Sequence, residues 1–358
     1  MNEREKIPSA EYPDLLSGCS KILVVRLRSI GDTVLATPTL RALRRHLPNA
    51  EIDILLEDWV APLLEGHSAV DSVIPVGRGA RERATVAMKL RRTGYDAVIN
   101  LHGGTTSTFL ARATGALIRA GFADYRYSFL YTHLLGSAAG FWNKSATHSA
   151  EQQLALAGFL GVPVGDRPSS ELEVTETARE FVENALSERG FPGADTPVAL
   201  IHPAAATFTK QWDVRNFAAL SDLLSRKGYF VAAVVSAREK GVLEAMTEYA
   251  DTAPAGFSGL SLPQVTALAE KASVFAGNDS GIAHIAAAVG TPPLVIFGSS
   301  NRDHWGPWTK GPSSIVFKSF ECQPCPGYEC AVYGDPRCIR EVGFEQVRRA
   351  FEELESRL

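Results

Sequence analysis

The chain has 358 residues, 45% hydrophobic and 21% charged, which is typical of a soluble globular protein with room for two domains. Its net charge of -4 gives no overall field that would attract nucleic acid or an anionic membrane. No apolar run reaches the roughly 18 residues that a membrane helix needs. The polar N-terminus lacks the apolar core of a signal peptide, so we expect a cytoplasmic protein.

The segment from Arg26 to Asp32 is predicted to turn from a strand into a helix. Residues 21–25 form the apolar run of a strand buried in a parallel sheet. In such sheets ligands bind at the carboxyl ends of the strands. Gly31 permits a tight turn, and Asp32 follows it close to Arg28. The Asp32 carboxylate has two possible roles: a helix cap, which the local sequence favours, or a general base.

Strands and helices alternate through the rest of the first half, which predicts a doubly wound parallel sheet. Thr37 is expected to cap the first helix, with Pro38 at its first position. A helix over 80–92 carries many Arg and Lys, for which a solvated face is the favoured interpretation. The remaining strands are expected at 52–56, 70–74, 95–101 and 118–122.

Two further segments of the first half could meet a polar ligand. His102 opens a turn rich in glycine and hydroxyl groups, and a simple turn is an equally good interpretation. Residues 123–147 are aromatic and irregular, and long structured loops are often functional. This loop contains or adjoins Arg126, His133, Lys144 and His148. Together with Arg26 and Arg28 these residues could form a basic, aromatic-lined acceptor site. Alternatively, the aromatic side chains only pack the loop against the domain.

The second half repeats the pattern after a linker at 161–168, which divides the chain into domains 1–165 and 166–358. A strand at 197–202 leads into small residues and then Lys210. A lysine at the mouth of a crevice suits phosphate, although a solvated lysine is the alternative.

Two more segments of this half could bind a nucleotide. Glu239 follows the next strand, where it could bind a ribose diol. Alternatively, it is an ordinary acid in the first turn of a helix, where the helix dipole stabilises a negative charge. After a strand that ends at Gly277, Asp279 or Ser280 is expected to cap a helix whose free N–H groups could bind phosphate. Asp279 itself would cap the helix or bind a sugar hydroxyl, because a carboxylate repels a diphosphate.

The C-terminal stretch holds four of the five cysteines within 17 residues. Their thiols could hold a structural zinc, pair in two disulfides, or stay free, and in the cytoplasm zinc is the better interpretation than disulfides. The four positions are Cys322, Cys325, Cys330 and Cys338. An amphipathic helix at 344–358 ends the chain, and it could pack back on the first domain.

Five motifs in order resemble the ADP-heptose:lipopolysaccharide heptosyltransferases, glycosyltransferase family 9. They are RLRSIGDTVLATPTLRALR, YDAVINLHG, HPAAATFTKQWDVRNFAAL, GNDSGIAHIAAAVGTPPLVIFG and a CxPCxxxxC tail. The resemblance implies a GT-B arrangement of two Rossmann-like domains facing across a cleft, an N-terminal acceptor domain and a C-terminal donor domain. It implies an inverting transfer of heptose from ADP-heptose that needs neither metal nor cofactor. The acceptor would be a Kdo or heptose hydroxyl of the lipopolysaccharide inner core, at the inner face of the cytoplasmic membrane, so the protein could be peripheral to that membrane.

The resemblance also implies roles for residues. Asp32 becomes the expected general base, which reverses the local preference for a cap. The expected donor-binding residues are Thr207, Thr209, Lys210, Glu239, Asp279, Ser280, Gly281 and His284. The expected acceptor-binding residues are Arg26, Arg28, Ser29, Gly31, His102 and Lys144.

One segment departs from the family pattern, and two other functions stay open. Ala204, Ala205 and Ala206 stand where some heptosyltransferases have threonines, which leaves open which hydroxyl meets the phosphate. The alternative functions are a nucleotide-sugar 2-epimerase of similar fold and a catalytically silent sugar-nucleotide-binding protein.

Overall fold

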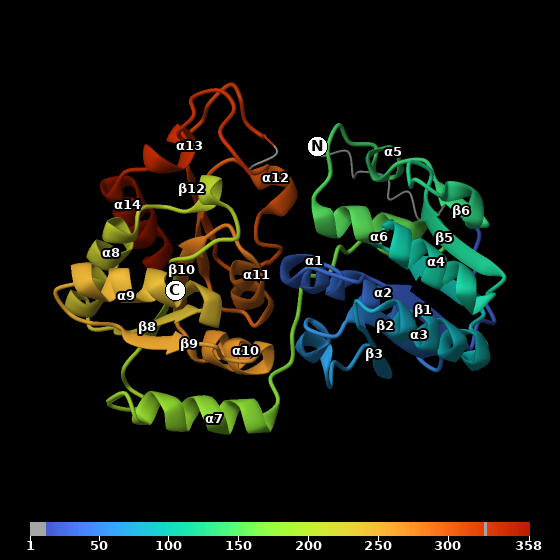
Figure 1. Cartoon of the computed structure of the whole chain (residues 1–358), viewed down its shortest axis with the longest axis horizontal. Coiled ribbons are helices and arrows are strands. Elements are labelled where there is room, and N and C mark those ends of the chain that lie inside the picture. Colours follow the sequence, from blue (N-terminus) through green and yellow to red (C-terminus); the bar gives the residue numbers. More distant parts are fainter. Residues whose placement is uncertain (1–11, 326–327) are drawn as a thin grey trace, which may run out of the picture. The chain divides into compact units, whose positions relative to one another are not determined.

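The computed structural model of the chain describes residues 12–325 and 328–358, which form two compact units (Figure 1). Unit 1 is Met1–Ser170 and unit 2 is Glu171–Leu358. Within the described residues each unit is built on one six-stranded sheet, and its strand pairs are parallel. The prediction of two doubly wound domains is therefore confirmed.

Unit 1 alternates strands and helices along the chain. Its elements are β1 (Lys21–Val25), α1 (Ile30–Val34), α2 (Thr37–His46), β2 (Glu51–Glu57), η2 (Ala61–Leu64), β3 (Ser72–Val76), α3 (Ala80–Thr93), β4 (Ala97–Asn100), α4 (Thr105–Thr114), β5 (Ile118–Phe122), η3 (Ser128–Leu130), β6 (His133–Leu135), α5 (Ala138–Trp142) and α6 (Ser149–Phe159).

The strand order of unit 1 is β3-β2-β1-β4-β5-β6. Successive strands are added toward one edge of the sheet from β1 to β3 and toward the other edge from β4 to β6, so the switch point lies between β1 and β4. Helix α2 packs with α6 and helix α3 packs with α4, so the two helices that follow β1 and β4 belong to different layers. The loops after these two strands therefore diverge. Such a switch point leaves a crevice at the carboxyl edge of a sheet, where ligands bind.

Unit 2 repeats this alternation. Its elements are α7 (Glu176–Ser187), β7 (Val198–His202), η4 (Phe208–Lys210), α8 (Val214–Arg226), β8 (Phe230–Val235), η5 (Ala237–Glu239), α9 (Lys240–Tyr249), β9 (Ala255–Ser258), α10 (Leu262–Lys271), β10 (Val274–Asn278), α11 (Gly281–Ala288), β11 (Pro293–Phe297), α12 (Arg302–Trp305), β12 (Ser314–Phe317), α13 (Arg337–Arg340) and α14 (Phe344–Glu355).

In unit 2 the strand order is β12-β11-β10-β7-β8-β9, so the switch point lies between β7 and β10. The strands on both sides of it are fully buried, which explains their unbroken apolar runs. The loop after β7 carries Lys210, and the loop after β10 carries Asp279 and Ser280.

Each unit has its own hydrophobic core. The terminal helix α14 contributes Val347, Phe351 and Leu354 to the core of unit 2, together with Trp212 and Phe217. The apolar face of this helix is buried within unit 2, against β11, β12 and α8.

Some local predictions differ from the structure. A short helix, α1, begins within the Arg26–Asp32 segment itself. Ala36 occupies the N-cap position of α2, so Thr37 is its first residue and not its cap. The aromatic loop contains a short strand, β6, and a helix, α5. Across residues 12–325 and 328–358, none of the helices has the length and apolar character that crossing a membrane requires.

Candidate active site

Asp32 lies at the carboxyl edge of β1, in the first turn of α1. Its Oδ2 accepts a hydrogen bond from the Ser29 hydroxyl at 3.0 Å and one from the Ser29 backbone N–H at 3.4 Å. Its Oδ1 forms an ion pair with Arg26. Arg26 also donates to the Leu101 carbonyl at 2.5 Å, so it joins the loop after β1 to the loop after β4. The carboxylate therefore caps its helix and is held in one position.

His102 lies across the same switch point, in the loop after β4. Burial and the positive charges of Arg26 and Arg28 lower the pKa of His102 to about 4. The imidazole is therefore neutral at pH 7, and its two ring nitrogens offer one donor and one acceptor. Arg28 is exposed, and Gly31 is buried inside α1. The structure thus gathers five of the six predicted acceptor residues on this edge.

Two residues that the sequence analysis missed shape this edge. Asn100, at the end of β4, accepts hydrogen bonds from the backbone N–H groups of His102 and Gly103. Tyr125 donates to the Asn100 carbonyl at 3.1 Å. Gly103 has φ +70, and a Cβ on it would lie 2.3 Å from the Tyr125 ring. Only glycine fits there, which explains the glycine turn.

The sixth predicted acceptor residue, Lys144, lies elsewhere in unit 1. Its Nζ is 2.8 Å from Glu151 Oε1, and the same carboxylate lies 3.4 Å from Arg167. Glu151 is 4% exposed, so its charge needs these partners. His148 caps the same helix, α6, where its Nδ1 accepts from the Ala150 N–H. Lys144 therefore takes part in an ion pair that neutralises the buried Glu151.

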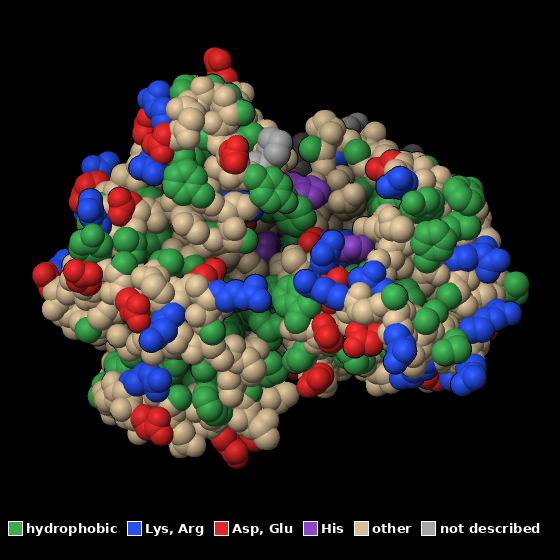
Figure 2. Space-filling view, viewed as in Figure 1, with side chains coloured by type: hydrophobic (Ala, Val, Ile, Leu, Met, Phe, Trp, Pro, Cys, Tyr) green, Lys and Arg blue, Asp and Glu red, His purple; other side chains and the backbone are tan. Residues whose placement is uncertain are grey.

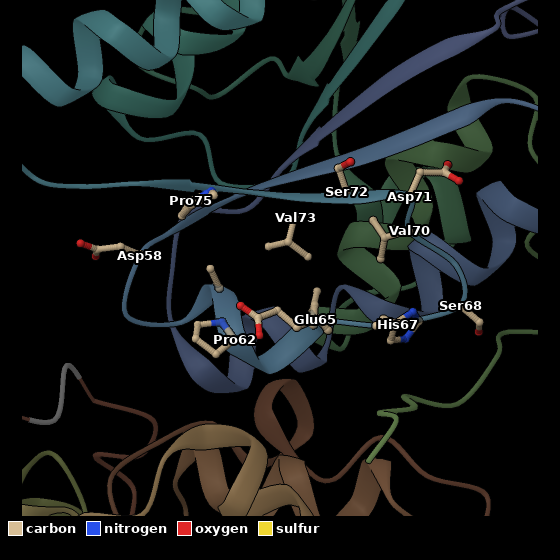
Figure 3. Close-up of a pocket in the computed structure, with 13 residues that line it drawn as sticks. Asp58, Pro62, Glu65, His67, Ser68, Val70, Asp71, Ser72, Val73 and Pro75 are labelled. Atoms are coloured by element: carbon tan, nitrogen blue, oxygen red, sulfur yellow. The ribbon is translucent and has the colours of Figure 1, made fainter. Parts of the chain in front are cut away.

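Unit 1 also holds an open cavity of about 520 Å³ beside its edge strand β3. Figure 3 shows Pro62, Glu65 and His67 on one side of it and Val73 and Pro75 on the other. None of the predicted site residues lines this cavity. It is therefore separate from the edge that carries Asp32.

In unit 2, Lys210 and Asp279 meet across the switch point. Lys210 Nζ lies 2.8 Å from Asp279 Oδ2, and the Asp279 side chain is only 6% exposed. The Ser300 hydroxyl donates to the same carboxylate oxygen. The prediction had named both residues without expecting that they would pair.

Asn278 holds the loops after β7 and β10 together. Its Oδ1 accepts from the Trp212 N–H at 3.0 Å, and its Nδ2 donates to the Pro203 carbonyl at 2.9 Å. Asn278 ends β10 as Asn100 ends β4, and both are fully buried. A polar amide at the end of an apolar run was the signal that could have revealed both residues.

The hydroxyl groups of the predicted donor residues fall into two groups. Thr209 is buried, and its Oγ1 accepts a hydrogen bond from the Ser299 hydroxyl at 2.9 Å, so its hydroxyl has a structural role. Thr207 Oγ1 and Ser280 Oγ are buried without a hydrogen-bond partner in the described structure. An unsatisfied buried hydroxyl is costly, so both are candidates to meet a ligand.

The remaining predicted donor residues lie on two helices. Gly281 is the first residue of α11, and His284 is buried further along it. Glu239 lies at the end of η5, where its Oε2 accepts from the Ser236 hydroxyl at 2.7 Å and the Ser236 N–H at 3.0 Å. In the structure Glu239 thus acts as a helix-capping acid.

A second cavity, of about 610 Å³, lies beside the loop after β7. Phe208, Gln211 and Trp212 line it with the α9 residues Gly241 and Val242. None of the predicted donor residues lines it, so it adds nothing to the donor assignment.

The four C-terminal cysteines are free and line one narrow cavity. Burial and the neighbouring thiols raise the pKa of Cys338 to about 11, so its thiol stays protonated at neutral pH. Among residues 12–325 and 328–358, no three His, Cys, Asp or Glu are arranged to hold a metal ion. The possible zinc site at Cys322, Cys325, Cys330 and Cys338 therefore finds no support in the described residues.

Comparisons with known proteins agree with the fold and show the family. The model of the family described as glycosyltransferase family 9 (heptosyltransferase) matches residues 83–334. Lipopolysaccharide heptosyltransferase 3 of Escherichia coli (strain K12) is 30% identical over 306 residues, which cover 79% of this chain and 84% of that protein.

Two solved structures share the fold. A family 9 glycosyltransferase from Veillonella parvula has a TM-score of 0.83 at 24% identity, covering 94% of this chain and 97% of that one. The ADP-heptose lipopolysaccharide heptosyltransferase II of E. coli has a TM-score of 0.77 at 21% identity, covering 93% and 98%. The chain belongs to glycosyltransferase family 9, and it is a glycosyltransferase with a GT-B type of fold.

Proposed function

We propose that the protein transfers heptose from ADP-heptose to a Kdo or heptose hydroxyl of the lipopolysaccharide inner core, with inversion and without a metal ion. Family membership supports the reaction class, and the names of the relatives support the donor and the acceptor. The observation that carries the proposal is the Lys210–Asp279 edge, because it combines a positive charge with unpaired hydroxyls at a switch point.

The donor diphosphate is proposed to bind at this edge of unit 2. Lys210 offers a compact positive charge, and α11 begins at Gly281 without a side-chain cap, so its first N–H groups could bind phosphate. Phosphate oxygens would also satisfy the unpaired hydroxyls of Thr207 and Ser280. Asp279 and Glu239 are proposed to accept hydrogen bonds from sugar hydroxyls of the donor. These fixed donors would stabilise the negative charge that grows on the leaving ADP.

The acceptor is proposed to bind at the edge of unit 1. The acceptor hydroxyl oxygen attacks the anomeric carbon, the bond from that carbon to the phosphate oxygen breaks, and ADP leaves with the electron pair. Asp32 takes the hydroxyl proton, since its carboxylate is fixed by Arg26 and Ser29. Arg28 would bind an acidic group of the acceptor, and the neutral His102 would orient a hydroxyl.

A donor screen tests this proposal. The purified protein is incubated with ADP-heptose, ADP-glucose, UDP-glucose or GDP-mannose, with a lipid A acceptor that carries either Kdo alone or Kdo and heptose. We expect the acceptor to gain the mass of one heptose with ADP-heptose alone. Transfer from another nucleotide sugar, or no transfer to either acceptor, would contradict the proposed donor and acceptor.

A further inference from the structure

Three aromatic side chains cluster on unit 1, two of them exposed and one half-buried, and we call them the aromatic patch: Phe109, Phe129 and Tyr127. Phe109 is 53% exposed and Phe129 is 79% exposed. The Tyr127 ring joins them, with centroids 5.4 Å from Phe109 and 6.4 Å from Phe129. Burying these rings would be favourable, so their exposure on a well-packed unit points to a binding surface.

Arg126 contacts the aromatic patch, and two further arginines lie on or against helix α4, which carries Phe109. Arg126 lies over the Tyr127 ring, 5.4 Å from its centroid. Arg112 is exposed one turn after Phe109 on α4. Arg91 reaches from α3 to the end of α4, where its Nη1 donates to the Thr114 carbonyl at 3.3 Å. These three residues, here called the basic rim, come from three different segments, so the fold gathers them.

Charge is unevenly distributed along the chain. Residues 78–135 contain nine Lys or Arg and three Asp or Glu, although the whole chain has a net charge of -4. Figure 2 shows Lys and Arg side chains among hydrophobic ones on the part of unit 1 that carries α3 and α4. The solvated face expected for residues 80–92 therefore belongs to a segment of the chain with a net positive charge.

We propose that the aromatic patch and the basic rim together bind the surface of an anionic lipid bilayer. Aromatic rings favour the interface between water and hydrocarbon, and guanidinium groups attract the phosphates of anionic headgroups. The combination of apolar rings with a positive rim is complementary to such a surface. It combines the two signals, insertion and charge, that stable peripheral binding needs.

The patch also lies next to the proposed acceptor edge. Helix α4 begins at Thr105, directly after the glycine turn, and Phe109 is four residues along it, about 6 Å of helix. Tyr125 touches Gly103 in that turn, and Tyr127 follows two residues later. A membrane bound at the patch would therefore present a lipid-anchored acceptor beside His102. This consequence rests on the proposed function, whereas the membrane binding itself does not.

Vesicle sedimentation tests the binding surface. We expect the full chain to sediment with phosphatidylglycerol-containing vesicles and not with pure phosphatidylcholine vesicles. Phe109→Ser with Phe129→Ser, and separately Arg112→Glu with Arg126→Glu, should each weaken binding at least tenfold. The matched controls, Phe181→Ser with Tyr249→Ser and Arg226→Glu with Lys310→Glu, change exposed side chains of unit 2 and should bind as the wild type does.

Three results would overturn the proposal. The first is that the wild type fails to bind anionic vesicles. The second is that the patch variants, shown to be folded by circular dichroism, bind as well as their controls. The third is a dimer, detected by ultracentrifugation, that the Phe109→Ser and Phe129→Ser changes dissociate, because the patch would then be an interface between copies of the chain.

An activity comparison separates this inference from the proposed function. With an acceptor freed of its acyl chains, the patch variants should turn over as the wild type does. With the same acceptor embedded in vesicles, the turnover of the patch variants should fall at least tenfold below that of the wild type. If neither the wild type nor any variant transfers heptose, but only the patch variants lose vesicle binding, the proposed function is wrong and the proposed membrane-binding surface is supported.

Discussion

Lys210 Nζ lies 2.8 Å from Asp279 Oδ2, so the residue expected to meet a diphosphate is paired with a buried carboxylate. The two residues come from loops on opposite sides of the switch point between β7 and β10. The pair holds the ammonium group at the edge of the sheet, and it also links the positions of both loops. An arriving diphosphate would share Lys210 with Asp279.

Replacing Lys210 should therefore weaken ADP binding. A hydrogen bond to a charged group contributes about 1.5–3 kcal/mol, so Lys210→Ala should raise the Kd for ADP by about 10- to 150-fold, measured by calorimetry. Lys240→Ala is the matched control, since Lys240 lies on the surface in an ion pair with Glu244. An unchanged Kd in Lys210→Ala would rule out its contact with the diphosphate.

That variant leaves Asp279 buried without its cation, which destabilises the protein for a reason unrelated to ADP. The double variant Lys210→Met with Asp279→Asn removes both charges. We expect it to recover thermal stability relative to Lys210→Ala while its ADP affinity stays weak. Recovery of ADP affinity along with stability would mean that Lys210 acts only through the fold.

Ser280 should behave differently, because its hydroxyl is buried without a partner and makes no capping bond to α11. Ser280→Ala is expected to leave the free energy of unfolding unchanged or to raise it, while ADP binds several-fold more weakly. Ser299→Ala is the comparison, since the Ser299 hydroxyl donates to Thr209. Loss of this hydrogen bond in Ser299→Ala should lower the free energy of unfolding by about 1 kcal/mol. Urea denaturation and calorimetry measure both quantities, and destabilisation of Ser280→Ala would contradict the assignment.

His102 makes stability depend on pH. Its pKa is about 4 in the folded protein against 6.5 for the model group, so the unfolded chain binds the proton more readily. The stabilising contribution is complete above pH 6.5 and is lost as the pH falls toward 4. His102→Gln lacks this titration, so the wild type should lose more free energy of unfolding than the variant between pH 7.5 and pH 5. Equal losses in urea denaturation would refute the buried, neutral histidine.

The sequence predicted the sheets well because their strands are buried apolar runs. It did not predict β6 (His133–Leu135), β9 (Ala255–Ser258) or β12, and the first two are short and carry few β-branched residues. All three lie at the edges of their sheets, where the pairing depends on neighbouring strands that the local pattern does not contain.

Motif resemblance named most of the candidate site, but not the contacts within it. The position of Lys210 in a loop gives no sign that Asp279 will neutralise it, because the two are 69 residues apart and meet only through the sheet order. The sequence likewise gives no sign of the hydrogen bond from Arg26 to the Leu101 carbonyl. The ion pair of Lys144 was also missed, since its partner Glu151 is buried only by the tertiary fold.

The rate of heptose transfer by Asp32→Asn, with Ser29→Ala as the matched control, tests the central claim most directly. Asparagine keeps the size of the side chain but accepts no proton, so kcat should fall by about two to four decades while the Kd for ADP changes little. Ser29→Ala removes the hydroxyl that donates to Asp32 in the capping box and keeps the Asp32 carboxylate. It should lower the free energy of unfolding by about 1 kcal/mol and leave kcat within a few-fold of the wild-type value. Wild-type turnover in Asp32→Asn would show that Asp32 only caps its helix and that the proton goes elsewhere.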